Sequence, residues 1–512
     1  MRKLVFAFAL ILTLRLAAAD LVGTERGKVE GAASADSKIR IFKGIPFAAP
    51  PVGALRWKAP QPAAKWSGVR KALEFGPRCM QTRVFPDMIF RDKGPSEDCL
   101  YLNVWTPAAS AKERLPVMVW VYGGGFAAGS ASEPRQDGEN LAKKGVVVVS
   151  LNYRLGLFGF LSHPDLAKES GREASGNYGL LDQVAALEWV RKNIAAFGGD
   201  PGKVTIFGES AGSFSVSALM GSPLAQGLFQ RAIGESGAFF SSTLPLKPRA
   251  QTEAEGSKFA ESLGAGSIEA LRAKPAEELM LAVMRYGAFR FSINVDGYFL
   301  PQDSYTIYGS GKQSHVPLLA GWNADEGSYR SIFASDKPTA ENFAARARKM
   351  FGDKADAVLK LYPAETDEQA KRSAQDLAGD QFIAFSTWKW MELHAATGKS
   401  PVFRYEFDEA PPQPAGAKTG ESRGAYHSAE IEFVFQALAS KDLPWRPEDF
   451  KLSDVMSSYW ANFAKTGDPN GPGLPEWRPY SAATNYGVMH LSASPHFEPD
   501  VHRARYEFLD AK

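Results

Sequence analysis

A serine between two glycines offers the clearest chemistry in this sequence. Gly208, Ser210 and Gly212 belong to a G-x-S-x-G pentapeptide, the pattern of a serine held on a sharp turn between a strand and a helix. The glycines are needed because a side chain at either position would clash with the neighbouring strand or helix. An alcohol held there, with a base in reach, can attack a carbonyl carbon and form a covalent intermediate. The pentapeptide therefore predicts nucleophilic catalysis at Ser210.

The same pentapeptide occurs a second time, around Ser422, so context must separate the two. Ser210 follows the strand-like residues 204–207 and precedes residues 213–220, which can form a helix that packs on a sheet. Ser422 follows a loop rich in proline and glycine, with no strand pattern before it. We therefore expect the turn at Ser210 and interpret the match at Ser422 as chance.

The serine hydroxyl needs a base, because an alcohol is a poor nucleophile at neutral pH. The chain has 7 histidines. In folds with this serine turn the nucleophile comes first along the chain, then the acid, then the histidine, which argues against His163. His427 follows the last strong strand pattern, at residues 402–407, after a long loop. Its position favours His427 as the base.

A carboxylate must hold the imidazole in the correct tautomer and stabilise its protonated form. Asp325 and Glu326 lie in a loop just beyond the strand-like residues 316–320. This is the carboxyl end of a strand, where α/β sheets gather their ligands. Spacing alone does not choose between the two residues.

Backbone donors for the oxyanion are expected in the glycine run at residues 123–125, which directly follows the strand-like residues 115–122. Glycine lets the backbone approach a substrate closely and adopt conformations that other residues avoid. The N–H group after the nucleophile, that of Ala211, should supply a further donor. The glycine run and the serine turn together predict an oxyanion hole.

The order of strands and helices predicts the frame that carries these groups. Nearly continuous apolar runs are typical of central strands covered on both faces, and they occur at residues 115–122, 146–152, 204–207, 316–320 and 402–407. Apolar side chains recur at helical spacing over residues 178–197. The alternation predicts an α/β fold with a large, mostly parallel central sheet flanked by helices. Residues 252–362 are largely helical in pattern, and we expect them to belong to a cap.

The N-terminus has the pattern of a signal peptide. Arg2 and Lys3 precede an apolar run over residues 4–14, and residues 17–19 offer a small-residue cleavage site. The run is shorter than the ~20 residues that span a bilayer, which favours cleavage over a membrane anchor or a buried helix. We expect a signal peptide over residues 1–19, cleavage near Ala19, a secreted or periplasmic protein, and a single domain over residues 20–512.

Composition limits the partners and cofactors. The 59 Lys and Arg residues nearly balance the 57 Asp and Glu residues, for a net charge of +2, so nothing indicates a nucleic-acid partner. No later stretch has the length and hydropathy of a membrane span. Cys79 and Cys99 cannot form a zinc site alone, and no paired-histidine spacing is present, so we expect no metal and no cofactor. In an exported chain such a pair favours one disulfide.

Together these motifs resemble the type-B carboxylesterase family, which includes the cholinesterases and some lipases. Residues 197–212 resemble the family's serine signature, residues 97–105 resemble its second signature, and residues 42–48, 177–183 and 427–435 also fit. The resemblance covers nearly the whole mature chain and implies an α/β-hydrolase fold with helical cap insertions. It also implies that Glu326 is the acid, that Gly124 and Gly125 donate to the oxyanion together with Ala211, and that Cys79 pairs with Cys99.

The resemblance implies a serine carboxylesterase that hydrolyses small-molecule esters through an acyl-enzyme on Ser210. Residues 289–292 resemble the segment that narrows the acyl pocket in cholinesterases, so Phe289 and Phe291 would line the pocket and favour short-to-medium acyl groups. The alternative is that both are core aromatics. The loop between Cys79 and Cys99 contains no tryptophan, so an aromatic contact for a quaternary ammonium group is expected to be missing. A lipase stays open as an alternative, as does a noncatalytic adhesion or binding protein, although such proteins have usually lost a residue of the triad.

Overall fold

A computed structural model describes residues 20–240, 245–287, 289–414, 416 and 424–511. The predicted signal peptide, residues 1–19, and the second serine match, Ser422, lie outside the described residues. Cleavage near Ala19 and export of the protein therefore stay predictions.

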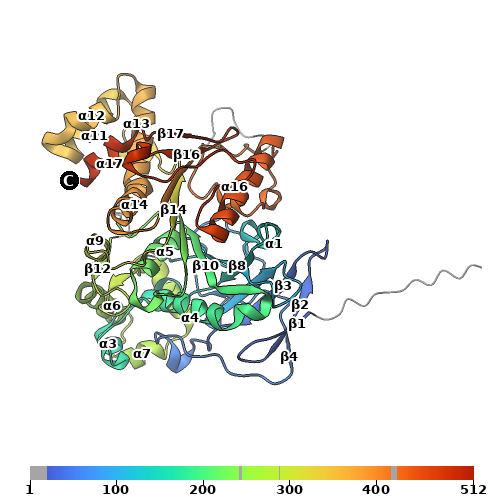
Figure 1. The fold of residues 1–512 in the computed structure, drawn as a ribbon. Helices are drawn as coiled ribbons and strands as arrows, with labels where there is room; N and C mark the ends of the chain where they lie inside the picture. Colours follow the sequence, from blue (N-terminus) through green and yellow to red (C-terminus); the bar gives the residue numbers. More distant parts are fainter. Residues whose placement is uncertain (1–19, 241–244, 288, 415, 417–423, 512) are drawn as a thin grey trace, which may run out of the picture.

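One sheet of 13 strands organises the described part of the chain (Figure 1). Its strands, in spatial order, are β1 (Asp20–Gly23), β2 (Lys28–Ala33), β3 (Arg40–Pro46), β7 (Tyr101–Thr106), β9 (Val147–Leu151), β8 (Leu115–Val121), β10 (Gly199–Glu209), β11 (Arg231–Glu235), β14 (Leu318–Asn323), β15 (Val402–Phe407), β16 (Val488–Leu491) and β17 (His496–Glu498), with β4 (Val69–Lys71) beside β2. The short ladders β5–β6 (Arg78–Cys79, Pro95–Ser96) and β12–β13 (Lys247–Pro248, Asn294–Val295) lie outside it.

In spatial order, neighbouring strands from β9 to β16 are parallel. Strands β1, β2, β3 and β7 at one end of the sheet, and β17 at the other, pair antiparallel with their neighbours along this order. Every side chain of β9 and of β14 is buried, as expected for central strands covered on both faces. The predicted α/β fold with a mostly parallel central sheet is therefore confirmed, with the addition of antiparallel edges.

Helices cover both faces of this sheet. Those described are α1 (Glu139–Ala142), α2 (Gly156–Phe160), α3 (Pro164–Ser170), α4 (Tyr178–Asn193), α5 (Ala211–Gly221), α6 (Arg249–Ser262), α7 (Ile268–Arg272), α8 (Ala276–Tyr286), α9 (Ser304–Gly309), α10 (Tyr329–Phe333), α11 (Ala340–Phe351), α12 (Ala355–Leu361), α13 (Asp367–Gly379), α14 (Phe385–Thr397), α15 (Ile431–Val434), α16 (Pro447–Thr466) and α17 (Arg503–Asp510). Among them, no helix has the length and apolar character needed to cross a lipid bilayer.

Strand β11 shows how the two faces differ. A side chain at Gly234 would collide with Trp390 of α14 and meet Ser213 of α5, whereas the next residue, Glu235, accepts a hydrogen bond from Trp460 of α16 at 2.8 Å. Because successive residues of a strand point to opposite faces, α5 and α14 cover one face and α16 covers the other.

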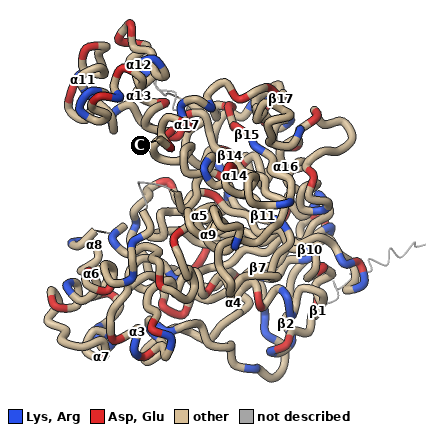
Figure 2. Tube along the Cα trace, turned by 60° about the vertical axis from the view of Figure 1, so that its left-hand side comes forward, with Lys and Arg blue, Asp and Glu red and all other residues tan. Residues whose placement is uncertain are grey.

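The expected helical cap over residues 252–362 is interrupted by β14, a central strand of the sheet. Helices α6, α7 and α8 precede this strand, and α10, α11 and α12 follow it. Helices α10 to α13, together with Leu509 of α17, form a second and smaller hydrophobic core. Helices α11 to α13 project from one end of the molecule (Figure 1). Acidic and basic residues are interspersed along the chain (Figure 2).

Candidate active site

Ser210 occupies the sharp turn between β10 and α5. Its backbone has φ 54° and ψ −122°, a strained conformation for a residue with a side chain. A Cβ atom at Gly208 would lie 2.5 Å from the carbonyl oxygen of Val121, and one at Gly212 would collide with the same oxygen. The two glycines therefore let β10 and α5 approach the neighbouring strand β8, and the turn presents the hydroxyl of Ser210.

The structure brings His427 and Glu326 to this serine. The Nε2 atom of His427 lies 2.9 Å from Ser210 Oγ, and its Nδ1 atom lies 2.5 Å from Glu326 Oε2. The other carboxylate oxygen of Glu326 accepts hydrogen bonds from Ser236 Oγ at 2.5 Å and from the backbone N–H of Asn323 at 2.9 Å. The carboxylate is buried, and its orientation is fixed by these donors.

Asp325 points away from the imidazole. Its Oδ1 atom accepts hydrogen bonds from Arg372 at 2.8 Å and from Gln375 at 2.7 Å, and its Oδ2 atom accepts one from the backbone of Ala425 at 2.9 Å. It therefore supports the loop that leads to His427. Of the two adjacent carboxylates, only Glu326 contacts the imidazole.

The glycine run after β8 forms a tight turn next to Ser210. Gly124 has φ 111° and Gly125 has φ 62°, and the carbonyl oxygen of Gly124 accepts hydrogen bonds from the amides of Ala127 and Ala128 at 3.0 and 3.1 Å. Within the described residues, the N–H groups of Gly124, Gly125 and Ala211 donate to no other group. These amides are available to a negatively charged oxygen at Ser210.

A cavity of about 360 Å³ opens onto Ser210, a volume at the small end for ligand pockets. Its apolar wall consists of Phe85, Met88, Phe214, Phe289, Phe382 and Ile383, and Asp87, Arg135, Glu209 and Ser428 add polar groups. The ring of Phe382 lies 5.2 Å from the imidazole of His427. Phenylalanines make up most of the apolar wall, and the nucleophile and the base also line the cavity.

The two phenylalanines predicted to share the acyl pocket are separated. Phe289 lines the cavity and lies against Gly125, where its ring atoms would come within 2.6 Å of an added Cβ. Phe291 does not line the cavity; it is buried against Phe259 and Tyr286 at centroid distances of 5.1 and 6.1 Å. The segment after α8 is irregular, so residues at alternate positions do not share one face as they would in a strand.

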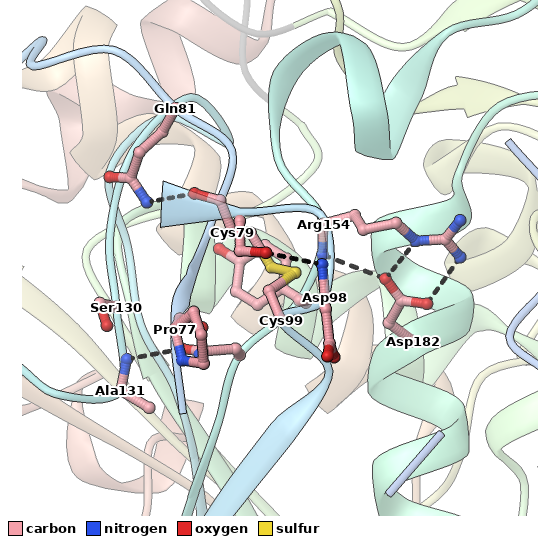
Figure 3. The surroundings of a disulfide bond; sticks show 12 residues. Pro77, Cys79, Gln81, Asp98, Cys99, Ser130, Ala131, Arg154 and Asp182 are labelled. Carbon is pink, nitrogen blue, oxygen red and sulfur yellow. Dashed lines mark hydrogen bonds and ion pairs between the residues drawn. A yellow bond between two sulfur atoms is a disulfide. The ribbon is translucent and has the colours of Figure 1, made fainter. Parts of the chain in front are cut away.

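Several cavity residues were not predicted. Phe85, Asp87 and Met88 come from the loop between Cys79 and Cys99, whose sulfur atoms form the disulfide that the family resemblance implied (Figure 3). The two cysteines in the sequence indicate that this loop is closed, but nothing in the sequence indicates that the loop contacts the cavity. Phe382 and Ile383 lie in the π-helix Asp380–Ala384, for which the sequence carries no periodic pattern.

Carboxylates dominate the electrostatics around the imidazole. The Oε1 atom of Glu209 lies 3.3 Å from Nε2 of His427. Burial raises the pKa of Glu209 to about 7, against the opposing effect of His427 and Arg135. Burial lowers the pKa of His427, but the charges of Glu326 and Glu209 outweigh this effect and raise it to about 10. Arg135, which pairs with Glu133 at 2.8 Å, is a cation in the cavity wall.

A substitution of Glu209 is expected to change the pH dependence. His427 accepts a proton only when neutral, so activity falls as the pH drops below the pKa of His427. Glu209→Gln removes a charge that favours the imidazolium, which lowers this pKa; the acid limb of kcat/KM should move to lower pH by ~1 unit or more. Asp87→Asn, in the same cavity wall, is the control and should leave the limb in place. A limb that stays, or moves to higher pH, in Glu209→Gln contradicts this electrostatic account.

Comparisons with known proteins identify the family and the fold of the chain. The family model described as "Carboxylesterase family" matches residues 18–509. The chain is 40% identical to the fumonisin B1 esterase of Sphingopyxis macrogoltabida over 481 residues, 89% of this chain and 83% of that protein. It is 38% identical to the para-nitrobenzyl esterase of Bacillus subtilis over 483 residues, 91% and 93% of the two chains. A solved structure of PNB esterase superposes with a TM-score of 0.80 at 35% identity, covering 95% of this chain and 99% of that one.

Proposed function

The chain belongs to the carboxylesterase family and is a carboxylic ester hydrolase with the α/β-hydrolase fold, and on this premise we propose that Ser210, His427 and Glu326 are its catalytic residues. The proposal is carried by one observation, the hydrogen-bonded series from Ser210 Oγ through His427 to Glu326. Ser210 lines the cavity together with Gly124 and Gly125, and Ala211 directly follows Ser210 in the chain.

The reaction proceeds in two acyl-transfer steps. His427 takes the proton of Ser210 Oγ as this oxygen attacks the ester carbonyl, and the amides of Gly124, Gly125 and Ala211 stabilise the oxyanion. The protonated His427 then gives its proton to the alcohol oxygen, which leaves. Water repeats the sequence on the acyl-enzyme and releases the acid. The carboxylate of Glu326 stays ionised and stabilises the imidazolium.

The cavity supports short-to-medium acyl groups as substrates. Its volume of about 360 Å³ is modest, and Phe289 stands against Gly125, beside the expected position of the ester carbonyl. Phe382, next to His427, borders the side on which the alcohol leaves. Two aromatic rings therefore limit the space on either side of the reacting carbon.

Shortening the side chain of Phe289 is expected to shift the chain-length preference. Initial rates on p-nitrophenyl esters from acetyl to palmitoyl should peak at short acyl chains in the wild type. In Phe289→Leu the ratio of kcat/KM for decanoyl to that for acetyl should rise about fourfold for each further CH₂ that becomes buried, since each contributes ~0.8 kcal/mol.

Phe291→Leu is the matched control, because Phe291 lies outside the cavity. It should lower the melting temperature while leaving the chain-length profile unchanged. Equal shifts in both variants would contradict the assignment of Phe289 to the pocket. A wild-type rate that peaks at palmitoyl would identify a lipase instead.

A further inference from the structure

The turn that carries Gly124 and Gly125 includes one strained residue, Phe126. Gly124, Gly125, Phe126 and Gly129 all have positive φ, at 111°, 62°, 58° and 129°, and Phe126 is not a glycine. Glycine adopts such conformations readily, but a residue with a side chain keeps one only where the surrounding structure holds it. The segment after the turn, residues 129–132, belongs to no helix or strand, so its position depends on contacts with side chains from elsewhere in the chain.

Gln81, on the loop closed by Cys79 and Cys99, binds both backbone groups of Gly129. Its Nε2 atom donates to the carbonyl oxygen of Gly129 at 2.8 Å, and its Oε1 atom accepts from the N–H of Gly129 at 2.9 Å. The same Nε2 atom donates to the carbonyl oxygen of Cys79 at 3.0 Å, so the side chain is anchored beside the disulfide (Figure 3). The side-chain amide of Gln81 thus takes the place of a backbone hydrogen-bonding partner for Gly129.

Asp92, near the other end of the same loop, holds the next residues of the segment. Its side chain is fully buried, and its Oδ2 atom accepts from Ser130 Oγ at 3.0 Å and from Ser132 Oγ at 2.6 Å. Its Oδ1 atom accepts from Arg78 Nη1 at 2.5 Å and from the N–H of Gly94 at 2.9 Å. A buried carboxylate with this set of donors keeps a single orientation.

The disulfide connects these supports to one another. Arg78 and Gln81 flank Cys79, and the loop returns to Cys99, 20 residues later. Between them Met88 reaches the turn directly, with its Cε atom 3.2 Å from the position of a Cβ at Gly124. The loop therefore contacts the turn at Gly124 and the segment after it at Gly129, Ser130 and Ser132.

We propose that Gln81 and Asp92 are positioning residues for the oxyanion hole, held in place by the Cys79–Cys99 bond. The inference rests on the proposed roles of Gly124 and Gly125. Their amides act on the oxyanion, which exists only in the transition state and the tetrahedral intermediate, so displacing them lowers kcat more than it raises KM. Loss of one such donor costs about 10²–10³ in kcat, and a displaced turn should cost somewhat less.

The test uses two near-isosteric variants of the full-length enzyme, Gln81→Met and Asp92→Asn. Each should lower kcat on p-nitrophenyl butanoate about tenfold to a hundredfold, with KM within about twofold of the wild type. The second readout is inhibition by a trifluoromethyl ketone. Ser210 Oγ attacks the carbonyl carbon of this ketone, the carbonyl oxygen becomes an oxyanion, and the serine proton passes to His427. Its inhibition constant should rise by the same factor by which kcat falls, which a purely structural role does not produce.

Arg83→Ala is the matched control, because Arg83 lies on the same loop and donates to Pro86 at 3.1 Å, within the loop itself. It should leave kcat and the ketone constant unchanged. The double variant Cys79→Ser, Cys99→Ser should reproduce the loss in kcat. If Asp92→Asn does not fold, Gln81→Met decides, since it removes three hydrogen bonds, two of them to Gly129, and buries no charge.

The proposal is overturned if folded Gln81→Met and Asp92→Asn keep kcat and the ketone constant within twofold of the wild type. A rise in KM with unchanged kcat also overturns it, because the loop would then only shape the substrate cavity. Failure of the proposed function is a separate outcome: it appears as activity and ketone binding that do not depend on Ser210 at all.

Discussion

Ser210→Ala is expected to lower kcat by ~10⁴ to 10⁶ on every ester that the wild type hydrolyses. The size follows from the role of the hydroxyl: without it no acyl-enzyme forms, and only the residual effect of the oxyanion hole and of substrate binding remains. Initial rates on p-nitrophenyl butanoate measure this loss directly, once the active-site concentration of the wild type has been determined.

The fold should be unaffected by this substitution. Alanine keeps the Cβ atom of residue 210, so the crowded turn between β10 and α5 keeps its contacts, and the melting temperature should stay within a few degrees. The hydroxyl donates to no group other than His427 in the described part of the chain. A large loss of activity with an unchanged melting temperature therefore identifies a chemical role.

Ser422→Ala provides the matched control, because Ser422 occupies the centre of the second G-x-S-x-G pentapeptide. It should retain full activity and still react with an organophosphate such as diisopropyl fluorophosphate, which should not label Ser210→Ala. Near-normal rates in Ser210→Ala together with inactive Ser422→Ala would reverse the assignment of the nucleophile.

The parts of the site that could be predicted are those fixed by local chemistry. The turn at Ser210 needs a strand, two glycines and a helix in immediate succession, and all of these are visible over residues 204–220. The glycine run at residues 123–125 follows its strand in the same way. In both cases residues that are adjacent in the sequence satisfy the steric requirement of the backbone.

The choice between Asp325 and Glu326 illustrates what spacing could not supply. Adjacent residues on an extended segment point in opposite directions, so one carboxylate must face the imidazole and the other must face away. Which one does so depends on where Arg372 of α13 and the loop before His427 lie, and these contacts join residues 47 and 100 positions apart. Only the family resemblance indicated Glu326 from the sequence.

The cavity wall was the least predictable part. Phe289 and Phe291 have the alternate spacing of a strand face, yet they lie in an irregular segment where this rule does not apply. Phe382 reaches His427 from a π-helix, whose extra residue shifts the side chains away from the usual helical period. Long-range packing, not local pattern, selects the side chains that line the cavity.

Glu326→Gln is expected to lower kcat by ~10⁴ through the tautomer of His427. Ser236 Oγ and the N–H of Asn323 both donate to one oxygen of this side chain. In glutamine the amide oxygen must stay there to accept them, so its NH₂ group turns toward Nδ1 of His427. The imidazole then accepts at Nδ1 and carries its proton on Nε2, where it can no longer take the proton of Ser210.

Asp325→Asn is the matched control, because it replaces one carboxylate oxygen of the adjacent residue with an NH₂ group, as Glu326→Gln does. Asp325 supports the loop at Ala425 and pairs with Arg372, so its substitution should lower the melting temperature while kcat stays within about threefold of the wild type. Single-turnover rates of acylation separate the two effects, since the tautomer acts on the chemical step. A ~10⁴ loss in Asp325→Asn with an active Glu326→Gln would transfer the role of the acid to Asp325. Equal small losses in both would show that the imidazole is oriented without either carboxylate.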